Sequence, residues 1–331
     1  MLASARHKVD VSGDEGAAPL LSVVLATDTY ETIRPVLSAL ARQRFAHQIE
    51  PVIVLPAGAE HTVRREELSA FPSLRVVVVD AVVPLSAPRA AGVRAASAPI
   101  VFIGETHSYP QAGWAEALLA AFEQPWTAVV PAISNANPTG MASRASYLFD
   151  YGIYHKNRTA GEMADPLTYN TAFRRGALMA VGPQLACALD PSHEALWPKL
   201  RAEGHRAAFA PDARILHLNV GSVGSLVLEK FCAGAVLGMC RAARWKWHRR
   251  LAYLLASPLI PAVLLVRVVR DSRGSRPRAL TVGTLPALML AAVAKALGEA
   301  FGYAGVTLPS FEARLSDIEI HKVRYAGRQA P

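Results

Sequence analysis

The sequence predicts an α/β fold with a mixed, mainly parallel sheet flanked by helices. The chain has 331 residues, of which 52% are hydrophobic and 18% charged, so it is long enough and apolar enough to bury a sizeable core. Four short segments consist almost entirely of strand-forming apolar residues, and helix-like segments lie between them. This alternation is typical of parallel strands that are buried on both faces of a sheet.

The predicted strands and helices follow one another from residue 20. The first strand, LLSVVLA at 20–26, precedes a helix at 29–43 that carries Pro35 near its first turn, where proline is tolerated. The other predicted strands are 49–55, 74–80 and 99–103, and the other helices are 88–97 and 113–122.

Polar residues follow the fourth predicted strand directly. They are Glu105, Thr106 and His107, which stand between an apolar strand and a helix. Ligands of parallel sheets bind beyond the carboxyl ends of the strands. The sequence therefore predicts a ligand site that includes this carboxylate and this imidazole.

The charge balance narrows the choice of partner. The formal net charge is +9, which suits nucleic acid, a membrane surface or an anionic substrate. The sequence has no basic strand face interleaved with aromatic residues and no zinc finger, so we expect no nucleic-acid partner. The sequence has only three cysteines, and none has a partner at zinc-ligand spacing. So few cysteines fit a reducing compartment best. We expect residues 1–18 to be a disordered lead-in without a secretory signal.

Four segments in a fixed order connect this sequence to a family. They are LSVVLATDTYETIRPVLSALARQ, RAAGVRAASAPIVFIGETH, NTAFRRGAL and LRAEGHRAAFAPDARILHLN. Together they resemble the family 2 glycosyltransferases of the GT-A fold, over residues 20–219. The resemblance implies a GT-A domain at 19–220 that transfers a sugar from a nucleotide-sugar donor, with inversion.

The resemblance also implies which residues bind the donor. Thr27 and Asp28 match the loop that holds the nucleotide, and Arg89 matches a position that helps to neutralise the diphosphate. Asn170 and Arg174 match a stretch beside the donor sugar. Simpler interpretations stay open: a helix cap next to Asp28, and solvated surface positions for the two arginines.

The resemblance implies a divalent cation, Mg²⁺ or Mn²⁺, at a variant acidic motif. Its ligands would be Glu105 and His107, with His217 from the segment ARILHLN. Thr106 stands where relatives carry an aspartate, and its neutral hydroxyl removes one negative charge, so metal binding stays open. In the alternatives, Glu105 caps the next helix or basic residues replace the cation. A second carboxylate, expected for base recognition after the second strand, is replaced by the segment 56–59.

Inverting transfer needs a general base near the acceptor hydroxyl. Asp190 and Glu194 are the candidates, because the family draws its base from an acidic stretch that opens a helix before LRxxGxR. Pro191 suits the first turn of that helix, and Asp190 is equally well explained as its N-cap. The Asn-, Gly- and Tyr-rich segment at 132–175 is long enough for an acceptor-side wall or a mobile lid.

The composition changes after residue 220. We expect a helical membrane-associated region at 221–306 and a C-terminal tail at 307–331. Two apolar stretches, 251–266 and about 279–294, have about 16 residues each, roughly 24 Å as a helix against about 30 Å of hydrocarbon.

Arginines stand on both sides of the first stretch, and prolines lie within it. A re-entrant or interfacial hairpin on anionic lipid explains this pattern. A buried helical appendage with a solvated basic loop is the alternative.

These interpretations combine into one functional hypothesis. The chain is expected to be a glycosyltransferase at the cytoplasmic face of the cell membrane, with a nucleotide-sugar donor and a lipid-linked or cell-envelope glycan acceptor. The alternative is a non-catalytic GT-A-like protein that binds a nucleotide sugar or scaffolds a partner at the membrane. The missing carboxylates at Thr106 and at 56–59 favour that alternative.

Overall fold

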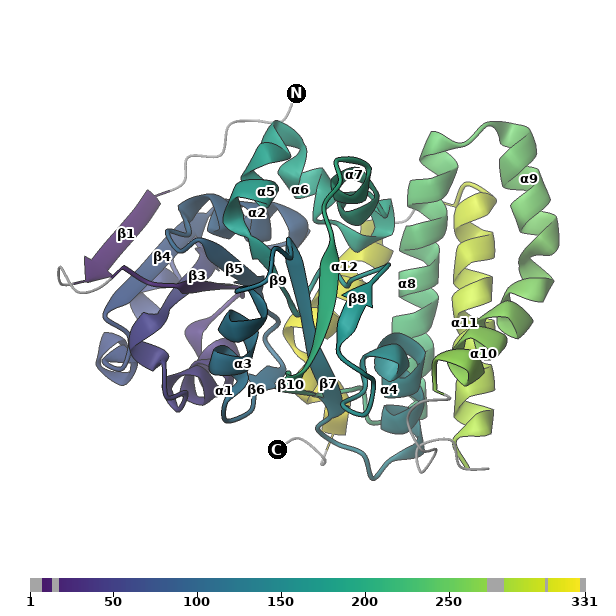
Figure 1. Ribbon diagram of the computed structural model, residues 1–331. Coiled ribbons are helices and arrows are strands. Elements are labelled where there is room, and N and C mark those ends of the chain that lie inside the picture. Colours follow the sequence, from purple (N-terminus) through teal and green to yellow (C-terminus); the bar gives the residue numbers. More distant parts are fainter. Residues whose placement is uncertain (1–7, 14–17, 273–282, 307–308, 328–331) are drawn as a thin grey trace. The chain divides into compact units, whose positions relative to one another are not determined.

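A computed structural model describes residues 8–13, 18–272, 283–306 and 309–327 (Figure 1). The chain divides into two compact units, and each is described by itself. The first unit contains residues 1–132 and 159–216, and the second contains residues 133–158 and 217–331. The expected boundary near residue 220 thus lies at 216, and the predicted wall or lid segment is shared between the two units.

The first unit is built around a mixed sheet of strands in the order β1-β4-β3-β2-β5-β9-β7-β10-β6, with β8 beside β10. The strands are β1 Lys8–Gly13, β2 Leu21–Ala26, β3 Ile49–Pro56, β4 Ser73–Val79, β5 Ile100–Ile103, β6 Ser108–Pro110, β7 Ala128–Asn135, β8 Gly161–Met163, β9 Thr171–Arg174 and β10 Ala207–His217. Strands β4, β3, β2 and β5 are parallel neighbours, whereas β1 and β9 pair antiparallel to them. The four predicted strands are therefore the parallel part, and the prediction of a mixed sheet flanked by helices is confirmed.

The three helices predicted in this unit are present as α1 Tyr30–Ala41, α2 Ser86–Ala95 and α3 Trp114–Ala121. The unit also contains α5 Arg175–Ala180, α6 Leu185–Ala188 and α7 Leu196–Ala202. Helix α2 lies directly against the strands, because a Cβ at Gly92 would stand 2.4 Å from a methyl group of Val24 on β2. Pro35 lies in the second turn of α1 rather than the first, so it removes one hydrogen bond of the helix interior.

The expectation of a disordered lead-in is wrong for residues 8–13. They form β1, which pairs antiparallel with β4, with Lys8 opposite Val78 and Gly13 opposite Ser73. The sequence does carry a short strand signal here, because Val9 and Val11 alternate with polar residues. The rest of the predicted lead-in, 1–7 and 14–17, lies outside the described residues.

The second unit is helical. It contains α4 Met141–Tyr151, α8 Val223–Arg244, α9 Trp247–Ala256, α10 Ile260–Asp271, α11 Leu285–Tyr303, α12 Pro309–Ile320 and α13 Lys322–Ala326. Side chains of α4, α8, α10, α11 and α12 share one apolar core, which includes Leu148, Leu226, Val268, Leu288 and Ile318. The segment expected as a C-terminal tail therefore consists largely of packed helices.

The apolar stretches form longer helices than the sequence predicts. Pro258 and Pro261 do not interrupt the first stretch, because each stands in the first turn of its element, where a missing N–H costs little. A 3₁₀ turn at Ser257–Leu259 joins α9 to α10. By length and composition alone, three helical segments of the described chain are long and apolar enough to cross a membrane: Val223–Arg244, Trp247–Asp271 and Leu285–Tyr303. Arg273, Arg276 and Arg278, expected to flank the first stretch, lie outside the described residues.

Glycines bring α8 and α11 into backbone contact. A Cβ at Gly234 would lie 2.2 Å from the carbonyl oxygen of Lys295, and one at Gly298 would lie 2.1 Å from that of Phe231. Gly238 and Gly302 meet in the same way one turn further along. The two helices thus pack through matching small-residue faces, which only glycine permits at this separation.

Candidate functional site

The carboxylate of Glu105 lies at the carboxyl end of β5, where the sequence predicts a ligand site. The strand end is fixed because the Gly104 N–H donates to the carbonyl of Val24, at 2.9 Å. Glu105 is only 5% exposed. Its Oε2 accepts from the Asn170 side chain at 2.5 Å and from Ser108 Oγ at 3.2 Å, and His107 Nε2 lies 3.8 Å away. The loop after β5 therefore turns its acidic and imidazole groups inward.

Asn170 is brought to Glu105 by the antiparallel pairing of β9 with β5. It precedes β9, and its N–H donates to the carbonyl of Ile103 at 2.8 Å. Its φ is 51°, in the left-handed region that asparagine tolerates better than most residues. Its side-chain Oδ1 is buried and has no hydrogen-bond partner among the described residues. The sequence identifies Asn170, but not its bond to a residue 65 positions away.

Arg89 and Tyr169 complete this group of residues. The Arg89 guanidinium lies 3.4 Å from the ring centroid of Tyr169, and the Tyr169 hydroxyl donates to the carbonyl of Leu189 at 2.8 Å. Burial raises the pKa of Tyr169 to about 12; the charge of Arg89 opposes the rise, and the carboxylates of Asp190 and Glu105 add to it. Three residues that the sequence predicts for the site, Arg89, Glu105 and Asp190, thus all influence the pKa of the buried Tyr169 hydroxyl.

We call Arg89, Glu105, His107, Tyr169 and Asn170 the carboxyl-edge cluster. Sequence reasoning missed Tyr169. The signal that was available is its position directly before Asn170, which the sequence already identifies as a site residue.

Asp28 follows β2 at the same edge of the sheet. Its Oδ1 accepts from the Thr29 N–H at 2.8 Å, from Thr32 Oγ1 at 2.9 Å and from Thr27 Oγ1 at 3.3 Å. Thr29 is the N-cap residue of α1, but its own side chain makes no capping bond. The predicted side-chain cap of α1 is therefore not formed, and Asp28 instead binds the Thr29 N–H and the hydroxyls of Thr27 and Thr32.

Asp190 acts as an N-cap, but of the short turn that follows it and not of the helix before LRxxGxR that the sequence predicts. Its Oδ1 accepts from the Ser192 N–H at 2.9 Å and from Ser192 Oγ at 2.5 Å. Its Oδ2 lies 3.3 Å from His193 Nδ1. The turn is a 3₁₀ helix at Pro191–His193, and the α-helix before LRxxGxR begins only at Leu196. Glu194 ends the turn with a φ of 50° and is exposed.

Arg174 lies at the other end of β9 from Asn170. The register of β5 with β9 pairs Ile103 with Thr171 and Ile100 with Arg174, so Arg174 stands at the amino end of β5. Its guanidinium donates to three backbone carbonyls at the end of α3 and just beyond: those of Phe122, Gln124 and Trp126. The structure thus does not bring Arg174 to the carboxyl-edge cluster, whereas the sequence resemblance assigns it to a position beside the donor sugar.

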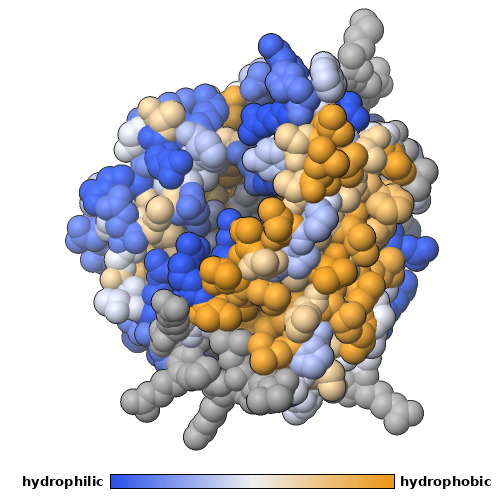
Figure 2. Space-filling model, turned by 90° about the vertical axis from the view of Figure 1, so that its right-hand side faces the viewer, coloured by the Kyte–Doolittle hydropathy of each residue, from blue (hydrophilic) through white to orange (hydrophobic). Residues whose placement is uncertain are grey.

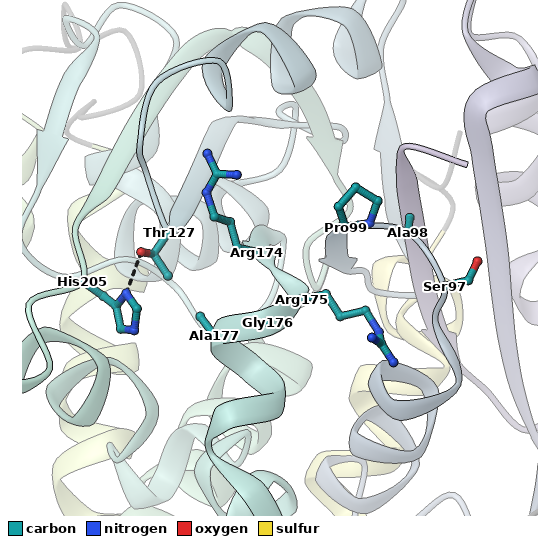
Figure 3. A pocket seen from close by; sticks show the side chains of 9 residues that line it. All are labelled: Ser97, Ala98, Pro99, Thr127, Arg174, Arg175, Gly176, Ala177 and His205. Carbon is teal, nitrogen blue, oxygen red and sulfur yellow. Dashed lines mark hydrogen bonds between the residues drawn. The ribbon is translucent and has the colours of Figure 1, made fainter. Parts of the chain in front are cut away.

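Arg174 instead borders a separate open pocket of about 480 Å³ (Figure 3). In Figure 3 the side chains of Arg174 and Arg175 point away from each other, and Thr127 is bonded to His205 at 2.9 Å. Arg175 donates to the carbonyl of Arg94 at 3.2 Å. Both arginines therefore satisfy backbone carbonyls of neighbouring segments, and they do not converge on the pocket.

His217 is the last residue of β10 and is 2% exposed. Its ring lies 4.3 Å from that of Tyr151, centroid to centroid. His217 and Tyr151 belong to the second unit, whereas Glu105 and His107 belong to the first. The three-residue ligand set therefore stays a prediction.

No protein-family model and no curated protein matches this chain. Among solved structures, it is similar to the mannosyltransferase PcManGT from Pyrobaculum calidifontis in complex with GDP-Man and Mn²⁺, at 18% identity and a TM-score of 0.47, over 98% of this chain and 87% of that one. It is also similar to residues 1–349 of TarS from S. aureus. The complex with UDP matches at 14% identity and a TM-score of 0.45, over 86% of this chain and 90% of that one. The structure of the same TarS fragment described without UDP matches at 14% identity and a TM-score of 0.46, over 90% of each chain.

Proposed function

We propose that this protein is a glycosyltransferase of the GT-A type that takes its sugar from a nucleoside diphosphate donor. One observation carries the proposal: a buried carboxylate, Glu105, bonded to Asn170 at the carboxyl end of a parallel strand. Arg89 lies in the same cluster, where its positive charge suits a diphosphate. The four family-like segments in the sequence point to the same chemistry.

The donor set at Glu105 fits a hard divalent cation such as Mg²⁺ or Mn²⁺. Such ions prefer oxygen ligands, and the carboxylate of Glu105 and the buried Oδ1 of Asn170 are two. His107 lies beside them, and His217 remains its proposed companion from the sequence. Thr106 Oγ1 lies 3.2 Å from His107 Nδ1 and orients that imidazole. A bound cation would stabilise the charge that develops on the departing nucleoside diphosphate.

Asp190 is the proposed general base. In an inverting transfer it would take the proton from the acceptor hydroxyl while that oxygen attacks the sugar. Its Oδ1 is held by Ser192, which leaves Oδ2, beside His193, to face an acceptor. Glu194 is the second candidate, and its exposed position makes it the weaker one. For the donor nucleotide we propose Asp28 and Thr27, since both follow β2 at the same edge.

We further propose a location at the cytoplasmic face of the membrane and a lipid-linked or cell-envelope glycan acceptor. The apolar helices Trp247–Asp271 and Leu285–Tyr303 support a membrane location, and the basic residues around them suit anionic lipids. A catalytic domain tethered to the bilayer encounters acceptors that are themselves anchored there.

The second candidate is a GT-A-like protein that binds a nucleotide sugar without transferring it. Two absences favour it: Thr106 provides no carboxylate, and Pro56 to Ala59 provide none at the end of β3. Both candidates predict donor binding, and only the first predicts turnover.

One experiment distinguishes the two candidates. Full-length protein in mild detergent is screened by thermal shift against UDP- and GDP-sugars, with and without Mn²⁺, and slow donor hydrolysis is measured in parallel. A glycosyltransferase gives metal-dependent stabilisation and hydrolysis, and Glu105→Gln abolishes both.

The matched control is Glu162→Gln, an exposed carboxylate paired with Arg206, which should behave as the wild type. Stabilisation without hydrolysis supports the binding protein, and no stabilisation by any donor contradicts both.

A further inference from the structure

Two helices of the second unit expose regular apolar stripes. On the joined helical segment Trp247–Asp271, which contains α9, the 3₁₀ turn and α10, the exposed residues Trp247, Leu251, Leu255, Leu259 and Val263 recur every four positions. On α11 the same spacing holds for Leu285, Met289, Val293, Leu297 and Phe301. Residues four apart lie on one face of a helix. Each helix thus turns a continuous apolar face outward, where a helix of a protein in water carries polar residues.

The two stripes form one surface. Helix α11 packs against both α9 and α10, so the stripes run side by side. Figure 2 shows a broad hydrophobic area on the side of the molecule that carries these helices. Its side chains are well exposed: Leu255 is 72% accessible and Val266 is 69% accessible. Contiguous apolar patches of this extent mark an interaction surface.

Basic residues lie at both ends of the α9–α10 stripe. Arg249 and Arg250 precede the apolar stretch, and Arg267 and Arg270 follow it. At the first end Arg249 stacks 4.2 Å over the ring of Trp245, which lies 4.6 Å from that of Tyr253. Arginine, tryptophan and tyrosine are the residues that suit the headgroup level of a bilayer. Both ends of the helix are therefore adapted to the same interface.

The packing of α8 argues against a membrane crossing. Glu229 on α8 accepts from Lys322 Nζ at 2.6 Å and pairs with Lys230 at 2.9 Å, and Lys230 also pairs with Asp150 of α4. Helix α12, which carries Glu312, packs along α8 as well. A crossing by α8 would carry these charged side chains and the polar helix α12 into the bilayer, where charged groups are strongly disfavoured. Helix α11 packs against α8 through glycines at backbone contact distance. We therefore expect that α11 does not cross the membrane either.

We propose that the protein is monotopic: the outer faces of α9–α10 and α11 lie in one leaflet of a bilayer that contains anionic lipid, and no helix of the described chain crosses it. The α9–α10 axis then runs along the interface, with its apolar side roughly 5–10 Å deep. This proposal rests on the membrane location given in the proposed function and adds how the protein sits in the bilayer. Vesicle binding is measured without any sugar transfer, so a failure of this proposal can be distinguished from a failure of the proposed enzymatic activity.

The first test is flotation of full-length protein, freed of detergent, with vesicles of phosphatidylcholine alone or with one quarter phosphatidylglycerol. We expect strong binding that is tighter to the anionic vesicles. The double variant Leu255→Glu/Val263→Glu should lose at least 10-fold in binding. The control Met141→Glu/Met179→Glu, which changes exposed apolar side chains outside the stripes, should bind as the wild type. Arg249→Gln/Arg267→Gln should weaken binding to anionic vesicles only.

The second test measures depth, and it does not require charged substitutions in the apolar face. Single cysteines at positions 259 and 293, in a chain without its three native cysteines, carry an environment-sensitive fluorophore. We expect a blue shift on vesicles and stronger quenching by shallow than by deep lipid quenchers. Strongest quenching at the bilayer centre, or labelling of positions 247 and 270 from opposite sides, would overturn the proposal. So would a detergent-free dimer that ignores vesicles, because a second copy would then cover the face.

Discussion

The side-chain amide of Asn170 donates to the carboxylate of Glu105 at 2.5 Å, joining the start of β9 to the loop after β5. Both groups are buried, and the other amide atom, Oδ1, has no hydrogen-bond partner among the described residues. The bond fixes the orientation of the one carboxylate in the variant acidic motif. Asn170 thus positions the Glu105 carboxylate, and its Oδ1 is a second oxygen that could bind a ligand at this site.

Replacing Asn170 should weaken metal binding. Asn170→Gly keeps the left-handed backbone without strain and removes only the amide. We expect Mn²⁺ affinity, measured by calorimetry, to fall by roughly 10- to 100-fold, the scale for lost ligand support. Asn157→Ala, an exposed asparagine of the second unit, is the control. Unchanged affinity in Asn170→Gly would separate this residue from the metal.

Two substitutions at Asp190 distinguish its capping role from its proposed catalytic role. Asp190→Asn keeps an oxygen that accepts from Ser192, so its melting temperature should stay near that of the wild type while transfer falls by about 10² or more. Asp190→Ala should lose both transfer and about 1 kcal/mol of stability. Melting curves and initial rates on the same samples provide the comparison. Full activity in Asp190→Asn would move the base to Glu194 or to no carboxylate.

Arg174 should matter for stability and not for the donor. Arg174→Ala removes the hydrogen bonds to Phe122, Gln124 and Trp126, so we expect a loss of roughly 1–3 kcal/mol in denaturant unfolding. Nucleotide-sugar affinity should stay within twofold of the wild type. Arg89→Ala is the companion variant, and it should lower donor affinity. A donor defect in Arg174→Ala would restore the role that the sequence suggests.

Glu50 should make the first unit sensitive to acid. Burial alone raises its pKa, but hydrogen bonds from Ser22, Ser97 and Arg75 outweigh this and hold the pKa below its ordinary value of 4.5. Its contribution to stability is therefore complete above about pH 4.5 and is lost as the pH falls through the lower folded-state pKa.

Glu50→Gln should cost roughly 2–4 kcal/mol at pH 7, because it leaves the Arg75 charge without its partner. The deficit should shrink below pH 4 in urea titrations. The exposed Glu31→Gln is the control and should cost under about 1 kcal/mol. A deficit independent of pH would contradict this account.

Replacing a glycine at the contact between α8 and α11 with a larger residue should destabilise the second unit. In Gly298→Ala the new Cβ would meet the backbone of Phe231 at 2.1 Å, so the helices must separate, and we expect a clear fall in melting temperature. Gly224→Ala lies on the same helix pair with its nearest neighbour 4.0 Å away, and it should be neutral or slightly stabilising. Equal behaviour of the two variants would show that the helices are not held this closely.

The sequence predicted the local elements better than the long-range pairings. The parallel strands are short apolar runs whose period and length are visible in the chain, so β2 to β5 were found within a residue or two. Strand β1 and the place of Arg174 depend on which strands pair and in which register. No local pattern encodes that register.

The site was predicted in part for the same reason. Glu105 and Asp28 directly follow predicted strands, and their position at one edge of the sheet follows from parallel pairing. Tyr169 joins them only because β9 returns antiparallel beside β5. The length of α9–α10 was underestimated because the predicted stretch was bounded by its flanking arginines, whereas the helical segment continues through them to Trp247 and Asp271.

The ion pair between Glu229 and Lys322 has a consequence for the order in which the chain is made. The two residues are 93 positions apart, and Lys322 belongs to the last described helix. At about 5–20 residues per second, roughly 5–20 s of synthesis separate the carboxylate from its partner. During that time α8 carries a charge that the finished fold buries, and the apolar segment Trp247–Asp271 has already been made. This ion pair can therefore form only after Lys322 has been made, and the apolar segment Trp247–Asp271 meets water or lipid before that contact exists.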